Sequence, residues 1–255
     1  FTSKNLAYHI ARSIYRHALK KTKKVFFQNF DDMNLFLEKR FVTKEITERI
    51  PGSGVDYEKF SPITGPKTNE ENFIFLFIGR LIKDKGIFEF VDAARIIRKK
   101  YPNAIFNVIG PIWHQNLRSN TITKSDLQNW ITEGIIDYQG EKKDIRKFIA
   151  EADCIVLPSY REGTSNILLE AASMEKPIVT TNTTGCKETV DDEVTGFLCK
   201  VKDAKDLAEK MEKMYLLSED DRKIMGKKGR EKIIKEFDKQ IVINAYLKAI
   251  DEILN

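Results

Sequence analysis

Two glutamates flank a run of small residues in the middle of the chain. The apolar residues 154–157 read as a strand, Glu162 follows in a loop, and a helical pattern that includes Glu170 begins near Asn166. The first N–H groups of a helix lack partners within the helix, and the helix dipole is positive there, so this turn suits an anion. Ionised carboxylates only accept hydrogen bonds, so the two acids suit hydroxyl groups. The residue types together suggest a ligand with both phosphates and hydroxyl groups.

The positions of the two glutamates suggest separate roles. Glu170 should lie one to two turns inside the helix, where its carboxylate could accept both hydroxyls of a ribose. Glu162 should lie nearer the apex of the loop, where it could hold a sugar hydroxyl. The alternative is that both are ordinary surface residues, since two glutamates at this spacing recur often by chance. Their place after a strand and around a helix start favours the ligand interpretation.

A basic loop follows the apolar run 73–78. It reads Gly79-Arg80-Leu-Ile-Lys-Asp-Lys85-Gly86, so Arg80 leaves a strand end and Lys85 precedes the next helix. Arginine suits a bidentate phosphate contact, and lysine acts as a point charge. Both cations, together with the helix start near Asn166, could hold a diphosphate. Taken alone, the loop fits a solvated basic turn better, because lysine and arginine number 43 in this chain.

Apolar runs alternate with helical patterns from residue 73 onward. The expected strands are 73–78, 104–109, 135–138, 153–157, 177–181 and 196–199. The expected helices are 87–100, 125–133, 144–152, 166–174 and 204–217. Unbroken apolar strands between helices predict an α/β fold with a doubly wound parallel sheet that is buried on both faces. Ligands of such sheets bind beyond the carboxyl ends of the strands, so the loops there should line one crevice.

The chain before residue 73 is expected to belong to another unit. Its expected elements are a helix over 4–20, strands over 23–28 and 47–50, and a short helix capped by Asp31. The stretch Pro51-Gly-Ser-Gly-Val-Asp56 predicts a tight crossing between domains. Residues 57–72 lack periodicity and include two prolines and a glycine, so a domain boundary is expected there.

The end of the chain reads as helix throughout. Ser218 should cap a helix over 219–236, with Asp221 in the position of a capping-box acid. Asp238 should cap a last helix, in which Ile241, Ala245 and Ile250 make an apolar stripe.

The composition fits a soluble globular protein of 255 residues with a net charge of +5. This charge suits anionic ligands or a membrane surface, and no nucleic-acid partner is expected. The basic face of residues 4–24 could lie on anionic lipid, although a solvated helix face is the favoured interpretation. Three cysteines without a C-x-x-C pair and three scattered histidines indicate no disulfide framework and no metal site. We therefore expect a cytoplasmic protein that could work at the inner face of the membrane.

Several motifs together resemble a known enzyme family. They are Gly79-Arg-Leu-x-x-x-Lys85-Gly86, Leu157-Pro-Ser-x-x-Glu162-Gly163 and Asn166-x-Leu-Leu-Glu170-Ala-Ala. These motifs, in this order, resemble the retaining glycosyltransferases of family 4, and the pair Glu162 and Glu170 looks like that family's E-x(7)-E motif. The resemblance runs from about Lys23 to the end of the chain. It is nearest to bacterial enzymes that build capsules, exopolysaccharides and lipid-linked oligosaccharides.

The resemblance implies a GT-B architecture, in which two Rossmann-like domains enclose the active site. Residues 1–65 would be the C-terminal remnant of the acceptor domain, and 66–238 would bind the sugar nucleotide. Residues 239–255 would form a helix that crosses back to the first domain. The donor would be a nucleoside-diphosphate sugar, with uridine diphosphate as the default, and the acceptor a saccharide or a lipid-linked saccharide. No cofactor would be needed.

The resemblance also implies roles for single residues. Arg80 and Lys85 would clamp the diphosphate in place of a divalent metal, and with Glu162 they would form the catalytic group. Glu162 would hold the transferred sugar, and Glu170 the ribose. The residues that would complete the phosphate cradle are Gly163, Thr164, Ser165 and Asn166. Fixed cations and N–H dipoles would stabilise the charge of the leaving diphosphate, with retention at the anomeric carbon.

One departure from the family pattern leaves another function open. The family's first domain should begin with a Gly-rich loop and several βα units, which are absent before Lys23. The chain could therefore bind a donor without turnover. A sugar-nucleotide epimerase of the same fold is a separate alternative. A nicotinamide oxidoreductase is disfavoured, because neither βα turn carries a G-x-G-x-x-G fingerprint. Sugar transfer remains the leading hypothesis.

Overall fold

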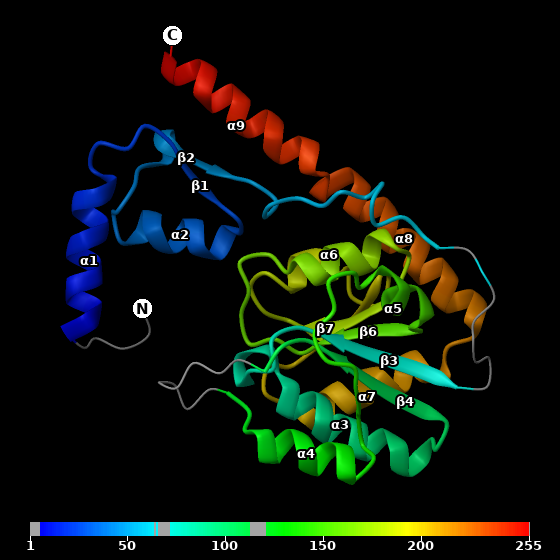
Figure 1. The fold of residues 1–255 in the computed structure, drawn as a ribbon. Helices are drawn as coiled ribbons and strands as arrows, with labels where there is room; N and C mark the ends of the chain where they lie inside the picture. The colour runs from blue at the N-terminus through cyan, green and yellow to red at the C-terminus, as the bar shows by residue number, and fades with distance from the viewer. Residues whose placement is uncertain (1–5, 64, 66–71, 113–120, 255) are drawn as a thin grey trace.

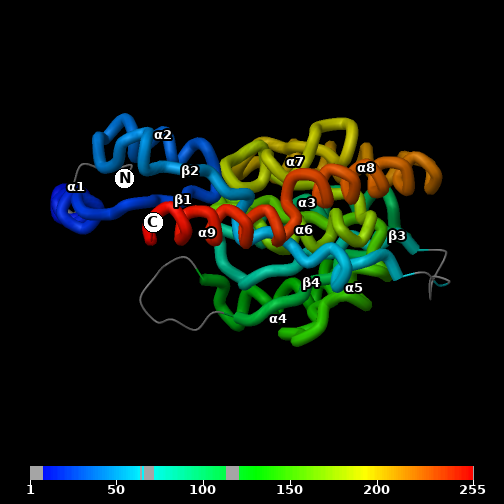
Figure 2. The backbone as a smooth tube through the Cα atoms, turned by 90° about the horizontal axis from the view of Figure 1, so that it is seen from above, coloured from blue at the N-terminus to red at the C-terminus, as the bar shows by residue number. Residues whose placement is uncertain are grey.

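The computed structural model describes residues 6–63, 65, 72–112 and 121–254 and shows two parts of unequal size. The larger part is built on a six-stranded sheet, and the smaller part on a two-stranded sheet (Figure 1). Figure 2 shows the two parts side by side, with the last helix extending from the larger part toward the smaller one. Both sheets are parallel throughout the described residues.

The sheet of the larger part has the strand order β5-β4-β3-β6-β7-β8. Its strands are β3 (Phe73–Ile78), β4 (Ala104–Ile109), β5 (Asp137–Tyr138), β6 (Cys154–Leu157), β7 (Ile178–Thr181) and β8 (Gly196–Cys199). The strand order reverses between β3 and β6, the two central strands, which pair at Phe75 and Cys154. This reversal is the point where doubly wound sheets bind ligands. The predicted fold class is confirmed.

Helices cover both faces of this sheet. They are α3 (Ile87–Lys100), α4 (Lys124–Thr132), α5 (Arg146–Glu151), α6 (Asn166–Ser173), α7 (Ala204–Leu216) and α8 (Glu219–Phe237). Helix α3 packs against α7 on one side, and α6 packs against α8 on the other (Figure 1). Every residue of β6 is buried, as expected of a strand covered on both faces. Three 3₁₀ turns complete the described elements: Lys44–Ile46, Lys83–Lys85 and Lys187–Thr189.

In the larger part, the strand expected over 135–138 and the helix expected over 144–152 are clearly shorter than the sequence predicts. Strand β5 keeps only Asp137–Tyr138 of the expected 135–138, because it is an edge strand that pairs with β4 alone. Helix α5 begins at Arg146 rather than at Asp144. The carboxylate of Asp144 accepts the N–H of Arg146 at 3.0 Å and so serves the helix start from outside it.

The smaller part contains α1 (Leu6–Leu19), β1 (Val25–Phe27), α2 (Phe30–Glu38) and β2 (Thr47–Arg49). The prediction that Asp31 caps the short helix was wrong. The N-cap is Asn29, whose side chain accepts the N–H of Asp32 at 2.8 Å. Asp31 lies in the first turn, and its carboxylate is bonded to the larger part instead.

The stretch 51–56, predicted to cross between domains, makes close contacts with the start of α6 and with Lys239. Gly52 lies against Thr164 at the start of α6, and Gly54 lies against the backbone of Lys239. The N–H of Val55 donates to the carbonyl of Phe237 at 2.8 Å. The predicted domain boundaries at 65 and 238 stay predictions, since residues 64 and 66–71 lie outside the described residues.

Helix α9 (Lys239–Leu254) runs from the larger part toward the smaller one (Figure 1). Asp238 caps it as predicted, accepting the N–H of Gln240 at 3.0 Å. The predicted stripe does not become a buried face, because Ile241 and Ile250 are exposed while the buried residues are Val242 and Ala249. The Tyr246 ring packs on Phe26 of β1 with centroids 4.6 Å apart. No described helix is both long and apolar enough to span a membrane.

Candidate active site

The loops after β3 and β6 meet at the reversal of strand order. The Tyr160 N–H donates to the carbonyl of Asp84 at 2.8 Å, and the Ser159 hydroxyl donates to the same oxygen at 3.0 Å. Gly86 has φ +75°, and a Cβ at this position would lie 2.1 Å from the carbonyl oxygen of Pro158. Only glycine allows this approach, which places the residue before it beside the second loop.

Lys85 and Glu162 form an ion pair at this junction. Their side chains are only 19% and 13% exposed, so water screens the pair weakly. Two residues that the sequence singled out in separate motifs are therefore in direct contact. Arg80 follows β3 at the same edge of the sheet and is exposed. The N–H of Glu162 donates to the carbonyl of Thr184, which ties the loop to the turn after β7.

The start of α6 offers donors that the described chain does not use. The N-cap is Ser165, whose side chain makes no capping bond, and its buried hydroxyl has no partner among the described residues. The N–H groups of Gly163 and Thr164 likewise find no acceptor within the described chain. Unpaired donors at a helix start are the groups that an anionic oxygen would satisfy.

The side chains of Thr164 and Asn166 are turned toward the smaller part. The Thr164 hydroxyl donates to the carbonyl of Gln28 at 3.1 Å. The Ser53 hydroxyl donates to the side-chain oxygen of Asn166 at 3.0 Å. These two residues were predicted to contact ligand, and the structure shows their side chains engaged by the segment that precedes the larger part. Thr164 can still offer its backbone N–H.

Glu170 lies in the second turn of α6 and has a different environment from Glu162. Its carboxylate takes part in no hydrogen bond or ion pair with a residue that the structure describes. Burial raises the pKa of Glu170 to about 7, against a smaller opposing effect of the Lys59 charge. Hydrogen bonds from two ligand hydroxyls would favour the ionised form and compensate for this burial.

A cleft of about 720 Å³ opens between the smaller part and the loop after β6. Aromatic rings of Tyr15, Phe26 and Phe36 line one side. Arg161 and Gly163 of the loop lie at its other side. The cleft is thus bordered by both parts of the molecule, next to the start of α6.

A family profile described as Glycosyl transferases group 1 matches residues 63–232. This chain belongs to that family. The match confirms the predicted glycosyltransferase resemblance, at the level of group 1. The site at the reversal of strand order lies inside the matched region.

Relatives of this chain are named for capsular polysaccharide biosynthesis and for transfer to a lipid-linked saccharide. The capsular polysaccharide biosynthesis glycosyltransferase CapM of Staphylococcus aureus is 32% identical over 197 residues, which are 74% of this chain and 50% of CapM. The N,N'-diacetylbacillosaminyl-diphospho-undecaprenol alpha-1,3-N-acetylgalactosaminyltransferase of Campylobacter jejuni is 28% identical over 260 residues, 98% of this chain and 66% of that enzyme. The chain therefore spans half to two thirds of the length of these relatives.

Solved glycosyltransferases share the fold. A glycosyltransferase from Rickettsia africae superposes with a TM-score of 0.83 at 22% identity, over 100% of this chain and 69% of that one. Anabaena Alr3699/HepE, solved in complex with UDP, superposes with a TM-score of 0.81 at 19% identity, over 96% of this chain and 69% of that one. These likenesses confirm the predicted GT-B fold.

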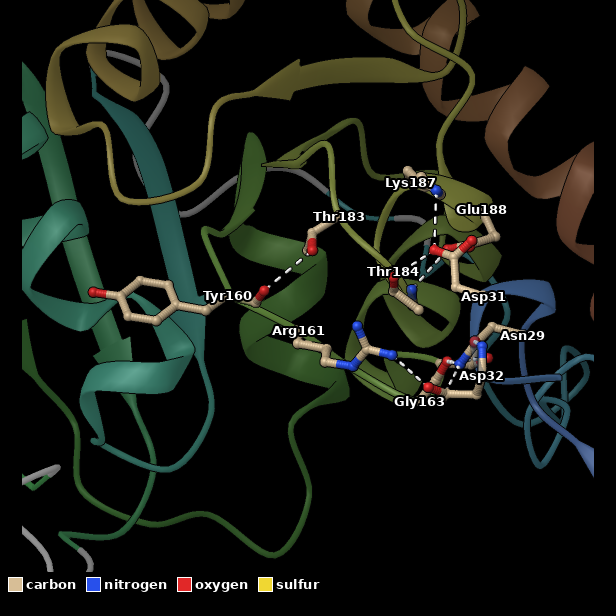
Figure 3. A network of polar contacts seen from close by, with 12 residues as sticks. Asn29, Asp31, Asp32, Tyr160, Arg161, Gly163, Thr183, Thr184, Lys187 and Glu188 are labelled. Atoms are coloured by element: carbon tan, nitrogen blue, oxygen red, sulfur yellow. Dashed lines mark hydrogen bonds and ion pairs between the residues drawn. The ribbon is translucent and has the colours of Figure 1, made fainter. Parts of the chain in front are cut away.

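Sequence reasoning missed a set of contacts that dock α2 on the site loops (Figure 3). The Asp31 carboxylate accepts hydrogen bonds from the Thr184 hydroxyl at 2.5 Å and from Lys187 at 3.1 Å. The hydrogen bonds from Thr184 and Lys187 lower the pKa of Asp31. Arg161 forms an ion pair with Asp32, which stands next in the same turn. Asp31 and Asp32 are typical of a helix start, but no pattern in the sequence identifies the residues that they contact.

Tyr160 is a second residue that the sequence did not single out. Its hydroxyl donates to Glu89 of α3 at 2.6 Å, and Lys202 lies 4.8 Å from the ring centroid. Burial, followed by the hydrogen bond to Glu89, raises the pKa of Tyr160. The neutral phenol thus fixes the start of the loop that carries Glu162. Its hydroxyl is bonded to α3 and is therefore not placed to contact a ligand.

Proposed function

We propose that this glycosyltransferase chain transfers a sugar, with retention of configuration, from a UDP-linked donor to a saccharide or lipid-linked acceptor in bacterial surface polysaccharide assembly. The observation that carries the proposal is the Lys85–Glu162 ion pair at the reversal of strand order. It places a cation and a hydroxyl acceptor side by side, next to the unpaired N–H groups before α6. A diphosphate joined to a sugar has the complementary chemistry.

The diphosphate would lie between the two loops. Lys85 and Arg80 would neutralise its charge, and the N–H groups of Gly163 and Thr164 and the Ser165 hydroxyl would donate to its oxygens. A hydrogen bond between charged groups contributes about 1.5–3 kcal/mol, so two cations suffice for a firm hold. Glu162, beside Lys85, would accept a hydroxyl of the sugar attached to the second phosphate.

The ribose would be held by Glu170. Its carboxylate is partly buried, has a pKa raised to about 7 and lacks a partner within the described chain. Two ribose hydroxyls would donate to its oxygens and favour the ionised form. The cost of burying this charge would then be offset only when the nucleoside is bound, which gives the site a preference for ligands with a ribose.

Catalysis would be electrostatic. As the bond from sugar to diphosphate breaks, negative charge builds up on the leaving oxygen, and Arg80, Lys85 and the N–H groups stabilise it without reorganising. The acceptor hydroxyl would attack the anomeric carbon from the face that the diphosphate leaves, and its proton would pass to the leaving phosphate oxygen. Glu162 is a poor candidate for a covalent nucleophile because Lys85 neutralises it. Retention is therefore assigned to same-face attack rather than to a double displacement.

The acceptor would enter from the side of the smaller part. The cleft beside Gly163 offers aromatic rings, on which the apolar faces of a sugar can stack, together with Gln28, Asp32 and Arg161 as polar partners. Two relatives, from Campylobacter jejuni and Escherichia coli, are named for lipid-linked acceptors, which are diphospho-undecaprenol saccharides. These observations support a lipid-linked saccharide as the acceptor.

Calorimetry and thermal stability test the donor assignment. UDP, ADP and GDP are compared with their nucleosides, and UDP should bind most tightly, because the galactosyltransferase relative of Escherichia coli is named for a UDP-Gal donor. A diphosphate at a hundred times its dissociation constant should stabilise the fold by about 2.7 kcal/mol. Arg80→Ala should weaken UDP binding and leave uridine binding unchanged. Equal affinities of the wild-type chain for UDP and uridine would contradict the proposal that Arg80 and Lys85 hold the diphosphate.

Turnover separates transfer from the two other functions. With UDP-sugars and a diphospho-undecaprenol saccharide, transfer should yield an extended lipid, and EDTA should leave the rate unchanged because cations of the chain hold the diphosphate. A strict need for added divalent metal would contradict the clamp. Donor binding without an extended lipid favours a donor-binding unit, and isomerised free UDP-sugar without acceptor favours an epimerase.

A further inference from the structure

Asn29 is a buried side chain whose polar atoms are all engaged. It is 1% exposed. Its Oδ1 accepts the N–H of Asp32 at 2.8 Å, which caps α2. Its Nδ2 donates to the carboxylate of Asp32 at 2.9 Å and to the carbonyl of Gly163 at 2.9 Å (Figure 3). The last bond joins the smaller part to the loop that carries Glu162, 134 positions later in the chain.

The bond to Gly163 sets the direction of the next N–H group. The peptide between Gly163 and Thr164 is trans, like every peptide bond of the described chain. In a trans peptide the C=O and the N–H point to opposite sides. Since the Gly163 carbonyl faces Asn29, the Thr164 N–H faces away from it, and no described residue accepts it.

Two further contacts hold the same peptide. The Thr164 hydroxyl donates to the carbonyl of Gln28 at 3.1 Å, so the residue after the peptide is tied to the residue before Asn29. A Cβ on Gly163 would lie 2.3 Å from Oε1 of Gln28, so the absence of a side chain permits this approach. The peptide is thus gripped by consecutive residues of the smaller part.

We propose that Asn29 is a positioning residue for the donor diphosphate: it holds the Gly163–Thr164 peptide so that the Thr164 N–H donates to a phosphate oxygen. This inference rests on the proposed function of the site. A donor that is already aimed needs no reorganisation when the ligand binds, and a hydrogen bond to the carbonyl of a peptide strengthens its N–H as a donor. Asn29 acts through the peptide and does not touch the ligand.

Two variants separate this role from simple docking of α2. Asn29→Ser keeps a neutral N-cap acceptor, because serine caps about as well as asparagine, but its hydroxyl is too short to reach Gly163. Asp31→Ala is the matched control: it removes the contacts of the same helical turn with Thr184 and Lys187 and leaves the Gly163 peptide untouched. Both variants remove contacts at the junction of the two parts, but only the first removes a hydrogen bond to the Gly163 carbonyl.

Calorimetry with UDP and uridine gives the readout. Asn29→Ser should bind UDP about tenfold more weakly while uridine affinity stays within about twofold of wild type. Asp31→Ala should leave both affinities within about twofold. Wild-type UDP affinity in Asn29→Ser overturns the inference while the proposed function stands, and so does an equal loss for UDP and uridine. If the wild-type chain binds UDP no better than uridine, the proposed function fails first, and the role of Asn29 with it.

Amide NMR of the wild-type chain tests the same point without a variant. The Thr164 amide proton should move downfield when UDP is added and stay in place when uridine is added, because only UDP supplies a phosphate acceptor. A Thr164 amide that UDP leaves unmoved, in a spectrum where other residues of the loop respond, overturns the role of Asn29.

Discussion

Glu162 and Glu170 flank the start of α6 at a distance of eight residues, and their carboxylates have different surroundings. Glu162 is paired with Lys85 and only 13% exposed. Glu170 has no partner within the described chain, and burial raises its pKa to about 7. One charge is thus compensated before a ligand arrives, and the other can be compensated only by a ligand. This difference is what the proposed roles require, with Glu162 at the sugar of the donor and Glu170 at the ribose.

The largest expected effect is on transfer in Glu162→Gln. The amide loses the ion pair with Lys85 and with it the fixed position of the sugar acceptor, so the rate of sugar transfer should fall about a hundredfold. UDP affinity should stay near wild type, because Glu162 is assigned to the sugar. Rates of sugar transfer and calorimetry with UDP measure these two quantities. A large loss of UDP affinity would instead assign Glu162 to the nucleotide, and the two glutamates would then not have different roles.

A smaller effect on affinity is expected for Lys85→Met. Loss of one charged contact should weaken UDP binding about tenfold to a hundredfold and leave uridine binding unchanged. The variant also leaves the partly buried Glu162 carboxylate unpaired, which should lower the free energy of unfolding by about 2 kcal/mol.

The double variant Lys85→Met/Glu162→Gln sharpens this result. Stability should recover because no unpaired carboxylate remains, whereas UDP affinity should stay low because the cation is still missing. Urea unfolding and calorimetry measure the two quantities separately. Recovery of UDP affinity in the double variant would show that Lys85 acts on the nucleotide only by holding Glu162.

The smallest effects are expected for Glu170→Gln, and they depend on pH. The folded-state pKa of about 7 lies above the unfolded value of 4.5, so the folded state binds the extra proton between these values, and stability falls as pH rises through this window. Glutamine does not titrate, so the Glu170→Gln variant does not lose stability in this way. The variant should match wild type near pH 4.5 and exceed its Tm by about 2–4 °C at pH 8.

Uridine binding to Glu170→Gln provides the functional counterpart. Wild-type affinity for uridine should fall several-fold from pH 8 to pH 5.5, as protonation removes the hydroxyl acceptor, and the variant should bind weakly and without this pH dependence. Calorimetry at several pH values in matched salt checks it. If the affinity of the wild-type chain for uridine does not change with pH, the proposed contact between Glu170 and the ribose is contradicted.

Much of the larger part could be predicted because its signals are local. Strands such as β3 and β6 are unbroken apolar runs, and their alternation with helices permits few topologies. The last helix shows the limit of such signals. Ile241, Ala245 and Ile250 recur at helical spacing, yet Ile241 and Ile250 are exposed and Val242 and Ala249 are buried instead. A stripe in the sequence does not say which face the rest of the molecule covers.

The sequence by itself determined the doubly wound parallel sheet and the residue types at the two loops. Only the tertiary structure decided which of those residues meet. Lys85 reaches Glu162 because the loops after β3 and β6 share the bonds at Asp84, and Asn29 reaches Gly163 because the smaller part docks on the second loop. Contacts between residues far apart in the chain depend on where each loop runs, to within a few ångströms. Helical and strand periodicity do not determine the path of a loop.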